Sequence, residues 1–416
     1  MFFGTFVKVN KPQKKKIDKM NISLQEIELR VQKIREAMQA EGVQNVCLRS
    51  VPAQLYMTGS VIQGYTLVDQ SESLPIFFLE RPTDALNGFP EERIYSVRKP
   101  ELIPPILEKL GLEMNDNSSL ELGHLPVTEF QRLERLSTSG KVSEVDACTL
   151  MRNVRSIKTE YEISEMRRLA LTHMEIYRLV PELYHPGITD CELQHELEYQ
   201  MRRRGSIGLF RAFGPRMEIF MGNVLAGSNA VNPAPYDFTM GGAGDPAMPM
   251  GATGLEITPG TTVMVDMSGN YGVYQTDITR TYYLGELPEE VINAHQLSIE
   301  LHEWFIEYAL PGAEISEVYL HCEKRAEEMG LSSNFMGTEF QAKFVGHGVG
   351  IEINEVPVLT PRWKGTFESG MVIALEPKFV FDKVGAVGLE NTYLISENGV
   401  ENLTPLPMEL IPLSEE

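Results

Sequence analysis

Four acidic residues in the C-terminal half of the chain each interrupt a run of apolar, often β-branched residues. They are Asp266 in VMVDMS, Asp277 in YQTDIT, Glu376 in IALEPK and Glu390 in VGLENT. A strand buried on both faces is normally almost continuously apolar, and a carboxylate inside it is costly unless it is paired, hydrogen-bonded or bound to a metal. Each acid alone fits an ordinary salt bridge or an edge strand. The four together indicate a shared site.

A histidine framed by glycines joins these acids. The stretch FVGHGVGIEINEVP places His347 between two glycines, where it is either a metal ligand or a buried structural histidine bonded to a backbone carbonyl. Four carboxylates facing one another repel unless cations neutralise them, and two divalent ions would do so. Carboxylates with one imidazole suit manganese, iron, cobalt or zinc. We expect His347 to be a ligand, because the metal set is incomplete without it.

Charge and cysteine usage exclude several classes of protein. The formal net charge of −21 argues against binding to nucleic acid or to an anionic membrane surface, since both need a basic face. The sequence contains no run of about 18 apolar residues, so no transmembrane helix is expected. The four cysteines are scattered without a C-x-x-C pair, which argues against a disulfide scaffold or a thiolate zinc site. A reducing, cytoplasmic location is expected.

The chain length and the pattern of apolar runs and loops predict two domains. A chain of 416 residues is too long for one ordinary core. The basic segment 1–19 is expected to be a disordered leader. Short apolar runs separated by loops predict an α/β domain over residues 20–152, which opens with a helix at 23–41. Ser23 and Glu26 form the expected capping box of that helix.

Residues 153–416 form the second predicted domain. Two long helices are expected at 155–184 and 188–204, followed by strands and helices in blocks rather than in strict alternation. This order favours an α+β fold with an antiparallel sheet. The stretch 205–260, rich in Gly, Met, Pro and Asn, is either a surface loop or a lid over a pocket.

The order of the motifs resembles the pita-bread metallopeptidases. D-x10-D, TRT, G-H-G-x-G, E-P and a last glutamate before a strand follow one another as in methionine aminopeptidase, aminopeptidase P and prolidase. The stretch RSIKTEYEISEMRRLA resembles the start of their catalytic domain, and the first domain resembles the creatinase-type domain of the aminopeptidase P and prolidase branch. The resemblance covers nearly the whole chain from residue 20. It implies a creatinase-type α/β domain followed by a pita-bread domain with a curved antiparallel sheet.

The resemblance also implies a dinuclear metal site. Asp277 and Glu390 would bridge two divalent ions, and Asp266, His347 and Glu376 would each bind a single ion. Manganese is the expected metal, with cobalt, iron and zinc as alternatives. A hydroxide held between the ions would attack a substrate carbonyl, and Glu376 would accept the proton.

Six further residues are candidates for orienting the ligands or contacting the substrate: Thr279, Thr392, Asn354, Tyr236, Asp237 and Glu352. The two threonines are expected to orient carboxylates, and ordinary strand positions are the alternative. A solvated loop glutamate is the alternative for Glu352.

Three positions depart from the family pattern. Ala234 and Asn354 stand where the family carries two histidines that bind the substrate carbonyl, and Gly388 stands where prolidases and aminopeptidase P carry an arginine. Loss of one such donor typically costs on the order of 10²–10³ in rate. Tyr236 and Asp237, which follow Ala234 closely, are candidate substitutes.

Three functions are compatible with these features. The leading one is an Xaa-Pro peptidase of the aminopeptidase P or prolidase type, acting on short peptides. The second is a metallohydrolase of a small non-peptide amide or cyclic amidine, which the three departures favour. The third is a peptide- or metal-binding protein with little turnover. A homodimer is expected from the resemblance alone.

Overall fold

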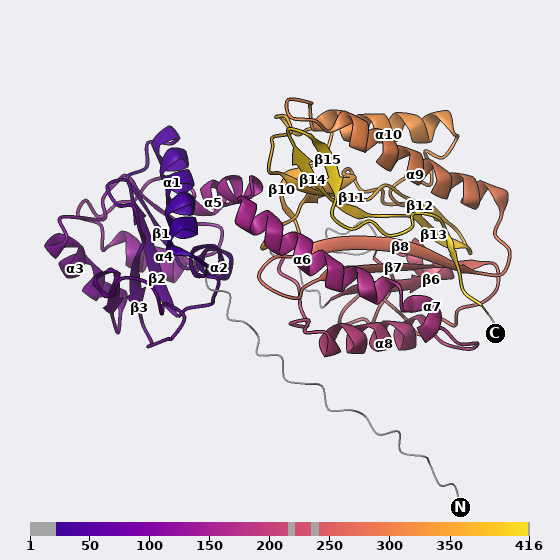
Figure 1. Ribbon diagram of the computed structural model, residues 1–416, viewed down its shortest axis with the longest axis horizontal. Helices are drawn as coiled ribbons and strands as arrows, with labels where there is room; N and C mark the ends of the chain where they lie inside the picture. Colours follow the sequence, from indigo (N-terminus) through magenta and orange to yellow (C-terminus); the bar gives the residue numbers. More distant parts are fainter. Residues whose placement is uncertain (1–21, 215–220, 234–240, 415–416) are drawn as a thin grey trace, which may run out of the picture.

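The computed structural model describes residues 22–214, 221–233 and 241–414 of the chain, and Figure 1 shows two parts joined by α5 (Ala147–Ser156). The first part is a mixed five-stranded sheet in the order β4-β3-β2-β1-β5, in which β1–β5 and β3–β4 are parallel and the other pairs antiparallel. Its strands are β1 Asn45–Leu48, β2 Gly64–Asp69, β3 Ile76–Leu79, β4 Ile94–Ser96 and β5 Ser118–Leu120. Its helices are α1 Leu24–Ala40, α2 Val51–Thr58, α3 Ile103–Lys109 and α4 Val127–Glu134, with 3-10 turns η1 Glu91–Arg93 and η2 Pro100–Leu102.

The second part holds one sheet in the order β16-β8-β7-β6, one in the order β10-β9-β11-β14-β15, and the hairpin β12-β13. In Figure 1, α6 and α8 lie on one side of these sheets and α9 and α10 on the opposite side. The helices are α6 Glu160–Tyr177, α7 Val180–Leu183, α8 Asp190–Arg203, α9 Glu289–Tyr308 and α10 Ser316–Glu328, with the 3-10 turn η3 Gly227–Val231. The strands are β6 Gly222–Ala226, β7 Thr261–Gly269, β8 Thr276–Leu284, β9 Gly346–Gly348, β10 Glu355–Val358, β11 Val372–Leu375, β12 Lys378–Phe381, β13 Gly385–Gly388, β14 Asn391–Ser396, β15 Gly399–Asn402 and β16 Ile411–Pro412.

This architecture confirms the predicted α+β class, with an α/β domain ahead of an antiparallel one. The β16–β8 pair is parallel, whereas β6–β7, β7–β8, β9–β11 and β11–β14 are antiparallel. Apolar residues of α6 and α8 pack on β6, β7 and β8, while those of α9 and α10 pack on β11 to β14. The site strands are therefore covered by helices on both sides, and none of the described helices is long and apolar enough to cross a membrane.

Four local predictions need correction. The expected helix at 155–184 is broken at Lys158, whose N–H bonds to Gly370 O at 2.8 Å, and it restarts at the Thr159 capping box. The stretch 205–260 contains β6 and η3 as well as loops. The run MVIALEPKFVF divides at Pro377 into two strands of different sheets. At α1 only half of the capping box is formed: Ser23 caps Glu26 N, while the Glu26 carboxylate bonds to Arg30 and Thr159.

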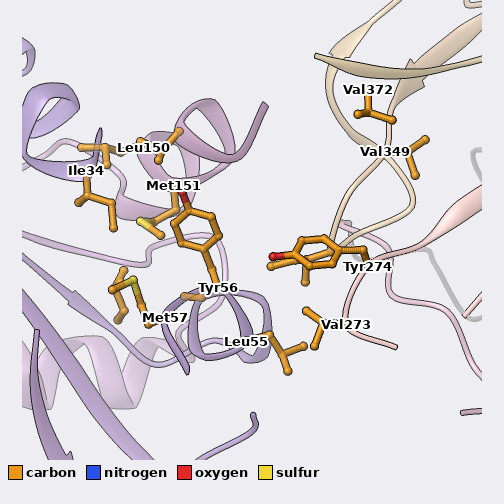
Figure 2. Packing of buried hydrophobic residues seen from close by; sticks show 14 of the residues in the cluster. Ile34, Leu55, Tyr56, Met57, Leu150, Met151, Val273, Tyr274, Val349 and Val372 are labelled. Atoms are coloured by element: carbon orange, nitrogen blue, oxygen red, sulfur yellow. The ribbon is translucent and has the colours of Figure 1, made fainter. Parts of the chain in front are cut away.

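The two parts share one hydrophobic core. Figure 2 shows Leu55 and Tyr56 of α2 facing Val273, Tyr274 and Val349 of the second part, and all belong to one cluster of buried residues. The fully buried Arg30 of α1 crosses the same boundary, donating to Tyr274 Oη at 2.9 Å. The second part is thereby fixed against the first next to the strands that carry the acids.

Candidate metal centre

The β7–β8 pair positions the two aspartates. Asp266 is the register partner of Thr279, and Asp277 is the partner of Ser268. β8 also reaches the other sheet, because Thr279 and Glu390 exchange both backbone hydrogen bonds, at 3.3 and 3.1 Å. Glu390 therefore lies beside the aspartates, although more than a hundred residues separate them in sequence.

β9 and β11 bring in the remaining two residues. His347 is the register partner of Ala374, and Glu376 N bonds to Val345 O at 2.8 Å. His347 Nδ1 lies 3.1 Å from Gly348 O, and the tautomer that donates this bond leaves the Nε2 lone pair toward the acids. Nε2 lies 3.5 Å from Glu376 Oε1 and 3.9 Å from Asp277 Oδ2. Two roles were considered for His347: a histidine bonded to a backbone carbonyl and a metal ligand. Its Nδ1 contacts the carbonyl of Gly348 while its Nε2 faces the acids, so the two roles are compatible.

Three of the five predicted ligands meet closely enough to hold one cation. One ligand atom from each of Asp277, His347 and Glu390 lies within 4.8 Å of the other two. Two carboxylates and one imidazole are a donor set that suits a divalent transition ion. Glu376 lies beside this group through its Oε1 contact with His347. The residues present therefore fit a single divalent ion at this position.

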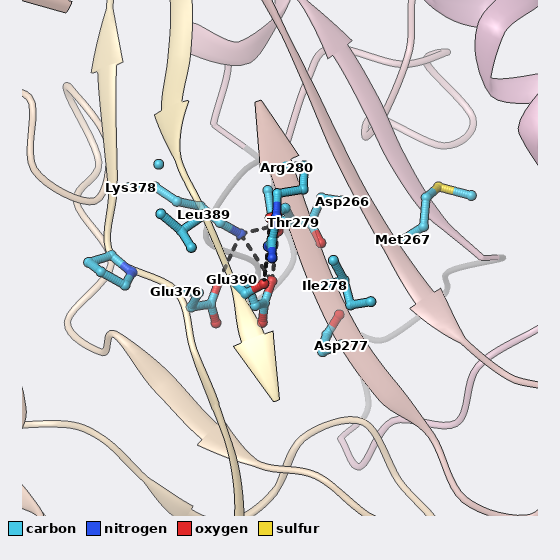
Figure 3. A network of polar contacts seen from close by, with 12 residues as sticks. Asp266, Met267, Asp277, Ile278, Thr279, Arg280, Glu376, Lys378, Leu389 and Glu390 are labelled. Atoms are coloured by element: carbon cyan, nitrogen blue, oxygen red, sulfur yellow. Dashed lines mark hydrogen bonds and ion pairs between the residues drawn. The ribbon is translucent and has the colours of Figure 1, made fainter. Parts of the chain in front are cut away.

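A lysine that the sequence analysis did not select occupies the other side of the acid cluster (Figure 3). Lys378 Nζ lies 2.9 Å from Asp266 Oδ2, 3.0 Å from Glu376 Oε2 and 3.5 Å from Glu390 Oε2, and its side chain is 0% exposed. The available signal was a lysine at the start of the apolar run KFVF, two residues after Glu376. An ammonium group therefore contacts three of the five predicted metal ligands.

The electrostatics of the cluster follow from burial and crowding. Burial raises the pKa of Asp277 well above its usual value, and the neighbouring Glu390, Asp266 and Glu376 raise it further. Burial also raises the pKa of Glu390, with Glu376 adding to the effect. Burial alone would lower the pKa of Lys378, but Asp266, Glu376 and Glu390 raise it well above its usual value. The acids need positive charge, and the lysine supplies one part of it.

Both predicted threonines contact ligand residues, in different ways. Thr279 Oγ1 donates to Glu390 Oε2 at 2.7 Å and so orients a carboxylate. Thr392 Oγ1 instead pairs with the backbone of Asp277, accepting from its N–H and donating to its carbonyl, both at 2.9 Å. Arg280, also not selected from the sequence, is buried and donates to Glu390 O at 2.8 Å. These bonds fix the strand ends that carry the acids.

The other candidates lie elsewhere. The Asn354 amide is paired with the backbone of Phe213, accepting from its N–H at 2.7 Å and donating to its carbonyl at 2.8 Å. Glu352 is buried and ion-paired with Arg155, with Arg152 at 3.7 Å, so it is not a solvated loop residue. Tyr236, Asp237 and Ala234 lie outside the described residues.

Two mainly antiparallel sheets that converge on a cluster of carboxylates and one imidazole define a metal-dependent hydrolase of the pita-bread class. The sequence matches metallopeptidase family M24 over residues 164–397 and the creatinase/prolidase N-terminal domain over residues 30–157. The first match spans more than half of the chain, so the protein belongs to metallopeptidase family M24. The resemblance and the fold predicted from the motifs are confirmed.

Known relatives extend over nearly the full length. The chain is 26% identical to the Xaa-Pro dipeptidase of Pyrococcus horikoshii over 388 residues, which cover 92% of this chain and 98% of that protein. The solved structure of an Xaa-Pro dipeptidase from Bacillus anthracis has a TM-score of 0.76 at 20% identity, covering 93% of this chain and 100% of that one. An X-Pro aminopeptidase from Thermotoga maritima has a TM-score of 0.73 at 19% identity, covering 91% and 99%.

Proposed function

We propose that the protein is a metal-dependent Xaa-Pro peptidase of the aminopeptidase P or prolidase type, acting on short peptides. The observation that carries the proposal is the meeting of Asp277, His347 and Glu390 within 4.8 Å, on a fold of this family. The full-length similarity to proteins named Xaa-Pro dipeptidase supports the substrate class.

The residues around the site have distinct tasks in this reaction. Asp277, His347 and Glu390 would hold a divalent ion, which would supply Lewis-acid polarisation and lower the pKa of a water molecule. Glu376 is the proton acceptor we propose, because its Oε1 faces the ligand group while its Oε2 is held by Lys378. Thr279 fixes Glu390 by its 2.7 Å hydrogen bond, so the acids keep their places as charge develops on the substrate. The same Glu376 would return the proton to the leaving proline nitrogen.

The identity of the ion is proposed from the donor atoms of the site, and the cellular location from the cysteines. We propose manganese, since most of the donor atoms are carboxylate oxygens. All four cysteines are free thiols, three of them buried, which supports a reducing compartment and a cytoplasmic location. A homodimer is the assembly we propose, on the family resemblance.

A second candidate function is hydrolysis of a small non-peptide amide or cyclic amidine. Asn354 favours it, because an amide bonded on both sides to Phe213 cannot take the part of the substrate-binding histidine. Gly388 favours it too, because it offers no cationic side chain where prolidases carry an arginine.

The test is amino-acid release from a panel of Xaa-Pro dipeptides and Xaa-Pro-Xaa tripeptides by the manganese-loaded full chain. Asp277→Asn is expected to abolish release, while the matched Asp116→Asn, at an exposed position in the first domain, is expected to leave it unchanged. Release that needs manganese and Asp277 supports the peptidase, and relative rates separate dipeptidase from aminopeptidase. No release from a sample of confirmed metal content would reject the peptidase and favour the amide hydrolase.

A further inference from the structure

Lys378 occupies the side of the acid cluster where a second cation is expected. Its ammonium nitrogen lies 2.9 Å from Asp266 Oδ2 and 3.0 Å from Glu376 Oε2, with Glu390 Oε2 at 3.5 Å (Figure 3). Asp266 is one of the three residues expected to bind a single ion, and it has no part in the group of Asp277, His347 and Glu390 that converges on the other side. The ammonium therefore lies between Asp266 and Glu376. It leaves Asp277, His347 and Glu390 close enough together to bind the other ion.

The backbone around Lys378 is held for this placement. Its N–H contacts Met336 Sδ at 3.4 Å, and its carbonyl accepts from Met336 N at 2.9 Å. Ser298 of α9 bonds to both neighbouring segments, donating to Pro377 O at 2.7 Å and accepting from Leu389 N at 3.3 Å. The lysine thus enters the cluster from a rigid hairpin.

Gly388 supplies a second, independent observation. It is the register partner of Lys378 on β12–β13 and has a φ of +133°. A Cβ at Gly388 would lie 2.9 Å from Lys378 Cα and 3.2 Å from Lys378 Cγ, and 2.6 Å from Pro377 O. Two of these three atoms belong to the backbone, so any side chain at 388 would force this segment to shift, and its Cβ would also press on the Lys378 side chain. The glycine therefore allows β13 to pack closely against Lys378 in its present position.

The charges at the cluster also match one ion plus one ammonium. Asp266, Asp277, Glu376 and Glu390 carry four negative charges when ionised. The ammonium with one divalent ion leaves one negative charge in the cluster, whereas the ammonium with two divalent ions would leave one positive charge among cations that repel one another. A second divalent ion at Asp266 would lie next to the ammonium that already contacts Oδ2 at 2.9 Å, and the two positive charges would repel each other. Glu376 divides its oxygens accordingly, with Oε1 toward His347 and Oε2 toward Lys378.

We propose that Lys378 replaces one metal ion of the two-ion family centre, so that this protein binds a single divalent ion through Asp277, His347 and Glu390. The inference deepens the proposed function, on which it rests for the identity of the site. Asp266 then serves as the partner of Lys378 rather than as a ligand. The single-ion centre proposed here replaces the two-ion centre that the motifs led us to expect.

The test counts manganese on the full chain, without substrate. Metal-free protein is titrated with Mn(II), the bound metal is measured after gel filtration, and the electron paramagnetic resonance spectrum is recorded. One ion per chain with the spectrum of isolated Mn(II) is the expected result. Two ions per chain with a spin-coupled spectrum, or no bound ion, would overturn the proposal.

Ligand variants make the count more specific. Asp266→Asn is expected to keep one ion per chain, with affinity reduced by on the order of tenfold at most, whereas His347→Ala is expected to bind none. In a two-ion centre His347→Ala would keep one ion, and that outcome would contradict the proposal. Lys378→Ala is expected to gain a second ion, and Lys364→Ala, an exposed lysine of the same domain, is expected to keep one.

The count is independent of turnover, so the two proposals can fail separately. One ion per chain with no cleavage of any Xaa-Pro peptide would reject the peptidase and support the replacement by Lys378. Two ions per chain with rapid cleavage would reject the replacement and support the peptidase. If Lys378→Ala does not fold, the wild-type, Asp266→Asn and His347→Ala counts still decide.

Discussion

Thr279 on β8 and Glu390 just before β14 meet twice: their backbones exchange two hydrogen bonds, and Thr279 Oγ1 donates to Glu390 Oε2 at 2.7 Å. This contact joins the two sheets at the acid cluster. It also means that one hydroxyl sets the direction of a carboxylate on which the proposed metal depends.

Thr279→Val is therefore expected to weaken Mn(II) binding by about 10–100-fold, because removing the partner of a metal ligand typically has that effect. Binding would be measured by isothermal titration calorimetry. Thr281→Val is the matched control, since Thr281 is equally buried and donates to Gly388 O at 2.8 Å without touching a carboxylate. Equal affinity losses in both variants would contradict the orienting role of Thr279.

Asn354→His is expected not to raise peptidase activity, although it restores the histidine of the family pattern. The amide bonds to Phe213 N and O, and an imidazole cannot accept and donate in the same plane to that one residue. Loss of the pair should lower the free energy of unfolding by about 1–3 kcal/mol. Urea unfolding and kcat/KM on an Xaa-Pro peptide would be measured together, with Asn354→Ala alongside. A histidine variant faster than wild type would show that the position acts on substrate.

The metal-free protein is expected to lose stability as pH rises above the ordinary carboxyl range. The folded-state pKa of Asp277 and that of Glu390 are raised, because both groups are buried among other acids. An acid whose pKa is higher in the folded state than in the unfolded state holds its proton more tightly when the protein is folded. Its contribution to stability is fully present below the unfolded-state pKa and is lost as the pH rises through the folded-state pKa. Urea unfolding between pH 4 and 8 should show the decline.

Asp277→Asn should remove part of that decline, because an amide resembles the protonated acid at every pH. Mn(II) should remove it in the wild type by neutralising the carboxylates, which links metal binding to stability at pH 8. A wild-type curve that rises with pH and is parallel to that of Asp277→Asn would exclude the raised pKa.

Arg155→Met is expected to destabilise the protein by about 3–5 kcal/mol, because it removes one cation from two buried carboxylates and leaves only the Arg152 and Lys158 pairs to compensate them. Arg155 is ion-paired with Glu352 and, at 3.1 Å, with Glu355, and all three side chains are buried. Arg167→Met removes the Glu401 pair, whose side chains are 43% and 46% exposed, and should cost less than about 1 kcal/mol. Guanidinium unfolding of both variants provides the comparison. A small loss for Arg155→Met would mean that the buried cluster is neutral in stability.

The acids of the centre were predictable because each interrupts an apolar run in the sequence, and that pattern is local. Asp266 and Asp277 do lie within strands, whereas Glu376 and Glu390 lie between two strands rather than inside one. The position of His347 beside them followed from the family order of motifs rather than from spacing. Lys378 was missed because a lysine in a strand is usually an edge residue, and only its contacts with Asp266 and Glu390 show that it points inward. The ligand roles and the domain limits at 20–152 and 153–416 stay predictions.

Long-range contacts explain the local errors. The helix expected at 155–184 is interrupted because Lys158 bonds to Gly370, more than two hundred residues away. Asn354 was considered for substrate contact because it stands where the family carries a histidine, and nothing near it in sequence reveals Phe213 as its partner. Periodicity and capping describe only neighbours along the chain, so neither could report these bonds.

The continuous core between the two parts has a consequence for how such an enzyme can evolve and be engineered. Leu55 and Tyr56 pack with Val273 and Tyr274, so removing the first domain would expose an apolar face of the second. The catalytic half is thus not a portable module, and the two domains should melt as one cooperative unit. A hinge at this boundary would open the core to water, so the two domains are expected to keep their relative position during the reaction.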